Sequence, residues 1–127
     1  MLTIQGGRRM KRDDELLRKL LLEMEESEDA LHIYHLVLAS SPEDAKAYYH
    51  LRLLVDEGFL EETGKSGGVF RMTNKGHDFT AAIRSDTVWN KTKDAAAQVS
   101  GVSISILKDI ALGIVRDQLV KMGVPLA

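Results

Sequence analysis

A helix that runs directly into a β-hairpin is the feature that most limits how this chain can fold. The run Ser40-Ser41-Pro42, a serine cap followed by proline in the first turn, predicts a helix start, and Gly58 predicts its end. Two β-prone runs, Phe59–Thr63 and Val69–Thr73, then flank the glycine-rich turn Gly64–Gly68. Because this turn lacks the strand-to-helix context of a phosphate loop, we expect a structural hairpin.

Further elements are predicted on both sides of this helix and hairpin. Apolar residues at helical spacing after an aspartate cap predict a helix over 14–26, and an aliphatic run predicts a strand over 31–37. After the hairpin we expect a helix that begins at Thr73 or Asn74 and buries Phe79, Ala82 and Ile83. A second helix, capped by Asp86 or Thr87, should reach about Val99, and a last one, capped by Ser103 or Ser105, about Met122.

The order helix, strand, helix, hairpin, helix is typical of a winged helix. We therefore expect a mainly helical α+β fold with a small β-hairpin, a winged-helix-like domain with additional C-terminal helices. The expected organisation is a basic arm or upstream extension over 1–9, the winged-helix-like domain over 10–84, and a C-terminal helical extension over 85–127 that packs on the body or dimerises. Winged-helix regulators have a positioning helix where this chain has the strand-like run 31–38, so the helix-turn-helix is incomplete.

Several local motifs resemble one bacterial and prophage family. They are Met10-Lys11-Arg12-Asp13, Tyr49-His50-Leu51-Arg52-Leu53-Leu54, Gly76-His77-Asp78-Phe79, and the run Ala82 to Lys93 with its distinctive Asp86-Thr87-Val88-Trp89. Together they are similar to the domain of unknown function 2513. The resemblance implies a small winged-helix-like protein, often in phage or prophage settings, and it brings no catalytic residues.

Nothing in the sequence predicts catalysis, a metal or a cofactor. The chain has no cysteine, which excludes disulfides and thiolate chemistry, and no nucleophile with a base at motif spacing is visible. His32 and His35 would point to opposite faces of a strand, and they lack a third ligand. We expect a protein that is not an enzyme, with no small-molecule substrate.

The fold favours DNA binding as a first hypothesis, although the formal net charge is only −2. We expect a transcription-regulator-like protein of bacterial or prophage origin that contacts duplex DNA. The candidate DNA-binding residues are Lys46, Tyr49, His50, Lys65, Arg71 and Lys75. The helix over 43–58 holds two cations against four carboxylates, which weakens this hypothesis. The alternative is a winged-helix module that binds a host protein, such as a phage accessory factor or inhibitor.

The last helix also carries a wide apolar stripe. We expect it to form a homodimer interface through Leu107, Ile110, Ile114 and Val115. Trp89 could be an exposed anchor for a partner, but we expect it in the core, as is usual for the single tryptophan of a small domain. No segment has the uninterrupted apolar length of a membrane span, so we expect a cytoplasmic location and no membrane partner.

Overall fold

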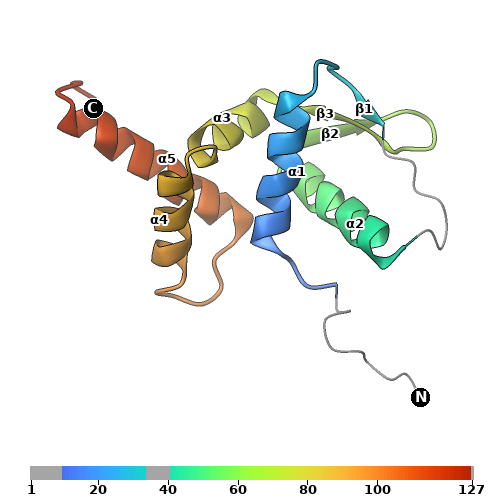
Figure 1. Cartoon of the computed structure of the whole chain (residues 1–127), viewed down its shortest axis with the longest axis horizontal. Helices are drawn as coiled ribbons and strands as arrows, with labels where there is room; N and C mark the ends of the chain where they lie inside the picture. Colours follow the sequence, from blue (N-terminus) through green and yellow to red (C-terminus); the bar gives the residue numbers. More distant parts are fainter. Residues whose placement is uncertain (1–9, 34–40, 127) are drawn as a thin grey trace. The chain divides into compact units, whose positions relative to one another are not determined.

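The computed structural model describes residues 10–33 and 41–126. It divides the chain into two compact units, Met1–Thr73 and Asn74–Ala127, which we call the winged unit and the helical unit (Figure 1). The elements of the winged unit are α1 (Asp14–Glu26), β1 (His32–Ile33), α2 (Pro42–Asp56), β2 (Leu60–Thr63) and β3 (Val69–Met72). Those of the helical unit are α3 (Asn74–Ile83), α4 (Asp86–Ala96) and α5 (Ile104–Lys121).

The winged unit combines two packed helices with a small antiparallel sheet. Its strand order is β1-β3-β2, with His32 opposite Phe70 and Leu60 opposite Met72. Helix α1 packs on α2, and α2 packs on β2. Phe59 and Phe70 are fully buried, as are Leu51 and Leu54 of α2. This apolar core holds α2 and the hairpin together.

Helix α2 passes into the hairpin through a tight C-terminal cap. Gly58 adopts a φ of +80°, a left-handed conformation that favours glycine. The next residue, Phe59, donates its backbone N–H to the carbonyl of Leu54 at 2.9 Å, which satisfies a free carbonyl at the helix end. On the far side of the hairpin, the Thr73 N–H donates to the Phe59 carbonyl at 3.0 Å. These bonds fix where the hairpin leaves the helix.

The helical unit is built from three helices around a mostly apolar core. Helix α5 packs on both α3 and α4. The buried side chains of the helical unit include Phe79, Ile83, Trp89 and Leu107. The buried hydroxyl of Thr92 donates to the Val88 carbonyl at 2.7 Å, so it is satisfied within α4. Trp89 is only 2% exposed, which confirms that it is a core residue.

The mainly helical α+β fold with a small hairpin is confirmed. The predicted helix over 14–26 matches α1, and the cap of α4 is Ser85, one residue earlier than expected. Of the predicted strand over 31–37, His32–Ile33 is a strand, and the remainder from residue 34 lies outside the described residues. The division after Thr73 groups α3 with the C-terminal helices, although we expected it within the domain over 10–84.

Candidate interaction surface

The outer face of α2 is defined by residues at the spacing i, i+4, i+7 and i+11. This surface, which we call the α2 face, consists of Ala45, Tyr49, Arg52 and Asp56, all exposed. Tyr49 is 40% exposed near its centre, and the half-buried Leu53 borders it. Leu51 and Leu54 point to the opposite side and are buried, so core packing sets the orientation of the α2 face.

A carboxylate of the hairpin holds both α2 and the hairpin turn. Glu62, on β2, accepts a hydrogen bond at Oε2 from the Tyr48 hydroxyl (2.9 Å) and another from the Gly68 backbone N–H (2.7 Å). Its Oε1 accepts a hydrogen bond from Nη1 of Arg52, which completes an ion pair. The Glu62 side chain is only 9% exposed, whereas that of Arg52 is 51% exposed. Glu62 therefore links two side chains of α2 to the turn.

The partners of Glu62 determine its charge state. Burial raises the pKa of Glu62, but the hydrogen bonds from Gly68, Tyr48 and Arg52 outweigh that effect and hold the pKa below its ordinary value. The same hydrogen bond to Glu62 raises the pKa of the Tyr48 hydroxyl. Glu62 is therefore a carboxylate, and Tyr48 a neutral donor, throughout the neutral pH range.

The hairpin turn is shaped around this carboxylate. Gly67 has a φ of +74°, and a Cβ atom at this position would lie 2.7 Å from Oε2 of Glu62. Such a distance is shorter than a van der Waals contact, so a side chain here would displace Glu62 or the turn. The turn contains Gly64-Lys65-Ser66, the same residues that end a phosphate-loop motif. It lies between two antiparallel strands, however, and no helix begins after it.

His50, one of the candidate DNA-binding residues, does not lie on the surface that a DNA contact requires. His50 is fully buried, with Nε2 accepting the Asp13 backbone N–H at 2.8 Å and Nδ1 lying 2.8 Å from the Lys46 carbonyl oxygen. A ring nitrogen beside a carbonyl oxygen must carry the proton, so these partners select the neutral Nδ1–H tautomer. His50 therefore joins α2 to the start of α1 and is not available to a base edge.

Lys46 is also part of this junction. Its Nζ lies 3.1 Å from Oδ2 of Asp13, and the other carboxylate oxygen of Asp13 caps α1 by accepting the Leu16 N–H at 3.2 Å. Partial burial raises the pKa of Asp13, but the hydrogen bonds from Lys46 and Leu16 lower it by more. The pKa of Asp13 is therefore below its ordinary value. Lys46 thus balances the negative charge of Asp13, the N-cap of α1.

The remaining candidate cations are dispersed. Arg71 of β3 pairs with Glu61 of β2 across the hairpin at 3.2 Å. Lys65 is exposed in the turn and makes no ion pair with any described residue. Lys75 is exposed on α3 and therefore belongs to the helical unit. The structure of the winged unit consequently brings Tyr49 and Arg52 together and leaves Lys65 as an exposed cation of its turn.

The two units differ in charge. Residues 1–73 contain ten lysines and arginines against fourteen aspartates and glutamates, a net charge of −4. Residues 74–127 contain seven against five, a net charge of +2. The sequence total of −2 therefore conceals an acidic winged unit, which is unfavourable for binding a phosphate backbone.

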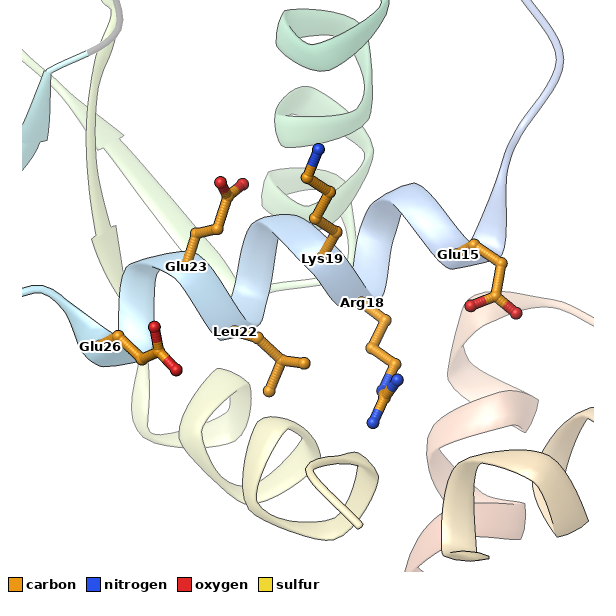
Figure 2. A pocket seen from close by; sticks show the side chains of 6 residues that line it. All are labelled: Glu15, Arg18, Lys19, Leu22, Glu23 and Glu26. Carbon is orange, nitrogen blue, oxygen red and sulfur yellow. The ribbon is translucent and has the colours of Figure 1, made fainter. Parts of the chain in front are cut away.

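A cavity of about 420 Å³ lies beside α1, and all its lining residues come from that one helix (Figure 2). They are Glu15, Arg18, Lys19, Leu22, Glu23 and Glu26. Figure 2 shows Lys19 and Glu23 pointing to one side of the helix and Arg18 and Leu22 to the other. Side chains that diverge in this way do not enclose a site as a small ligand requires.

The described ranges, 10–33 and 41–126, hold neither a metal site nor a membrane-spanning helix. No group of three or more histidine, aspartate or glutamate side chains there is arranged to hold a metal ion. His35, one of the two histidines of the predicted strand, lies outside those ranges. None of the helices described has the length and apolar character needed to cross a bilayer.

The comparison with known proteins agrees with the motifs noted in the sequence. The family model described as "Hypothetical protein (DUF2513)" matches residues 11–103. The chain belongs to the DUF2513 family. A Haemophilus influenzae protein named "Uncharacterized protein" is 29% identical over 117 residues, which cover 87% of this chain and 99% of that protein. No solved structure matches the chain.

The motifs that identify this DUF2513 protein have clear structural roles. Asp13, in the first motif, caps α1, and His50, in the second, binds its backbone N–H. Trp89, in the fourth motif, is buried in the helical unit. The family match ends at residue 103, which is the N-cap of α5. The distinctive residues thus hold the fold together, and two of them, Tyr49 and Arg52, lie on the α2 face.

Glu62 is the residue that the sequence analysis missed. It lies two positions after the buried Leu60 on the same strand, so strand periodicity places both on one face of the sheet. The available signal was an acidic residue on the inward face of a strand, next to a turn that contains the pair Gly67-Gly68. Its partners on α2 could be recognised only in the folded chain.

Proposed function

We propose that the winged unit is a protein-binding module and that the α2 face is its docking surface. The observation that carries this proposal is the combination of an exposed Tyr49 with an Arg52 already held by a buried carboxylate. Tyrosine and arginine are the residue types that most often dominate binding energy at protein interfaces. Here they lie three residues apart on one helix face.

Both side chains are restrained before any partner binds. The Tyr49 ring packs edge-on against the buried His50 ring, with centroids 5.8 Å apart and an interplanar angle of 77°. Arg52 is restrained by its ion pair with Glu62. Restraint of this kind lowers the entropy lost on association, because fewer side-chain conformations remain to be fixed.

The charge of the unit indicates the chemistry of the partner. With a net charge of −4, the winged unit repels acidic surfaces and attracts basic ones. Asp56 extends the α2 face at one end, and Glu43 and Asp44 are exposed in the first turn of the helix. The partner we propose is a protein with a basic rim around a site that accepts a tyrosine ring.

Duplex DNA is the second candidate, and one observation supports it. The elements occur in the order of a winged helix, and the turn of the hairpin exposes Lys65. Arg52 and Arg71 would each have to leave a carboxylate before contacting a phosphate. One unpaired cation per wing supplies a salt-dependence slope of only about 0.9, which corresponds to weak binding.

The experiment uses the full chain and compares the two candidate partners, a protein and duplex DNA. Tyr49 is replaced by a photo-crosslinking phenylalanine derivative, and the protein captured from cells that encode this chain is purified. The purified partner is then titrated with wild type, Tyr49→Ala and Arg52→Ala, and with Asn90→Ala as an exposed control in the helical unit. We expect the two α2-face variants to bind at least about 30-fold more weakly.

Parallel titrations use a random DNA duplex at about 50 mM salt. Unchanged partner affinity in both Tyr49→Ala and Arg52→Ala would contradict the docking proposal. DNA binding that weakens on Lys65→Ala, in a protein that yields no partner, would instead support the regulator hypothesis.

A further inference from the structure

Helix α5 is covered by its own chain over only part of its length. Its first half contributes Ile104, Leu107 and Ala111 to the core of the helical unit, and each is at most 6% exposed. From Leu112 to Leu126 no described residue is buried. The C-terminal end of α5 extends past α3 and α4, as Figure 1 shows.

The uncovered segment is strongly apolar. Among its fifteen residues, eight are large and apolar: Leu112, Ile114, Val115, Leu119, Val120, Met122, Val124 and Leu126. Six of these are exposed, from 36% for Leu112 to 76% for Met122. A helix that is apolar around most of its circumference is normally buried, and a continuous exposed apolar surface usually marks an interface.

The spacing of these residues indicates what kind of element covers them. Leu112, Val115, Leu119 and Met122 follow one another at intervals of three, four and three, the spacing of the a and d positions where two helices pair; the first three lie in α5, and Met122 is its C-cap. Beyond the helix the chain turns back on it, because the Val124 N–H donates to the Leu119 carbonyl at 3.0 Å. The occupant should therefore be another helix with an apolar seam.

Charge on this segment permits the partner to be an identical helix. A two-fold dimer places each surface against itself, so a seam that carried charges of one sign would repel its copy. The four seam residues carry none, and Lys121 pairs with Asp117 on the same helix at 3.0 Å. An acidic or basic partner would find no complementary charge along this seam.

We propose that the distal half of α5, residues 112–126, is a self-association surface that pairs with the same segment of a second copy of this chain. The apolar periodicity of the sequence predicts a dimer stripe on Leu107, Ile110, Ile114 and Val115. That placement is wrong for Leu107, which is 2% exposed inside its own chain; Ile110, Ile114 and Val115 are half-buried, and of these three only Val115 belongs to the seam proposed here. The exposed seam residues are Leu112, Leu119 and Met122, and the first of them lies five positions after Leu107.

Sedimentation velocity of the full chain, from about 1 µM to about 1 mM, tests the proposal. We expect a concentration-dependent monomer–dimer equilibrium in the wild type. Leu119→Asp and Met122→Asp should each weaken self-association by at least about 30-fold. Both positions are exposed, so the variants should keep the wild-type circular dichroism spectrum.

Val99→Asp is the matched control, because Val99 is 64% exposed in the helical unit but lies outside the seam. It should dimerise as the wild type does. A wild type that remains monomeric over the whole range would overturn the proposal. So would a dimer that persists unchanged in both Leu119→Asp and Met122→Asp.

Discussion

Replacing Glu62 with glutamine tests whether one carboxylate fixes the hairpin against α2. Glutamine has nearly the same shape but no charge, and it offers one acceptor oxygen where Glu62 offers two. That oxygen can keep the hydrogen bonds from Gly68 and Tyr48, at 2.7 and 2.9 Å in the wild type, while the amide nitrogen would face the Arg52 guanidinium. The substitution therefore weakens two hydrogen bonds and abolishes the ion pair.

The expected magnitude follows from the strength of hydrogen bonds to charged groups. Such a bond contributes about 1.5–3 kcal/mol, whereas a neutral one contributes about 0.5–1.5 kcal/mol. Neutralising the acceptor of two bonds should lower the free energy of unfolding by about 2 kcal/mol. Urea unfolding at pH 7, monitored by circular dichroism, measures this difference. Tyr48→Phe, which removes one of the two charged bonds altogether, should cost about 1.5–3 kcal/mol.

The effect should depend on pH in a defined direction. Because the folded-state pKa of Glu62 lies below its unfolded value, its contribution is complete at neutral pH and is lost as the pH falls below the ordinary value of about 4.3. The stability difference between wild type and Glu62→Gln should therefore shrink on acidification. A difference below about 0.5 kcal/mol at pH 7, or one that does not change with pH, would refute the reasoning.

Three further substitutions test other parts of the structure. Gly67→Ala should lower the free energy of unfolding by more than about 1 kcal/mol, because φ at this position is positive and the added Cβ would meet Glu62. A smaller loss in a Glu62→Ala background would show that the clash with Glu62 causes part of it, and an equal loss would exclude that cause. His50→Phe keeps an aromatic ring but leaves the Asp13 N–H without its acceptor, so the free energy of unfolding, measured by thermal unfolding, should fall by about 1–3 kcal/mol. A variant as stable as the wild type would show that the hydrogen bond to Asp13 contributes nothing. Trp89→Ala should cost about 3–5 kcal/mol by urea unfolding, because the ring is 2% exposed, and a near-neutral result would contradict its place in the core.

Local patterns in the sequence determined the secondary structure. Apolar spacing placed α1 over 14–26, the run Ser41-Pro42 placed the start of α2, and the glycine-rich turn placed the hairpin. These features depend on neighbours a few residues apart, since capping, periodicity and turn geometry are local interactions. The family motifs could also be recognised in the sequence, and the family model matches residues 11–103.

The role of each polar residue depended instead on distant partners. The sequence offered His50 as a DNA-contacting residue, but the Asp13 N–H, 37 positions earlier, supplies a partner that makes its burial favourable. Lys46 and Arg52 are cations in the sequence, yet in the fold each lies against a carboxylate from another element.

The same distinction applies to the apolar residues of α5. The sequence showed one long stripe, and only the packing of α3 and α4 decided that Leu107 is covered while Leu119 is open. Periodicity predicts which residues share a face, because it follows from backbone geometry. Whether that face is buried, paired or free depends on which other elements the folded chain brings against it, and this information is not local in the sequence.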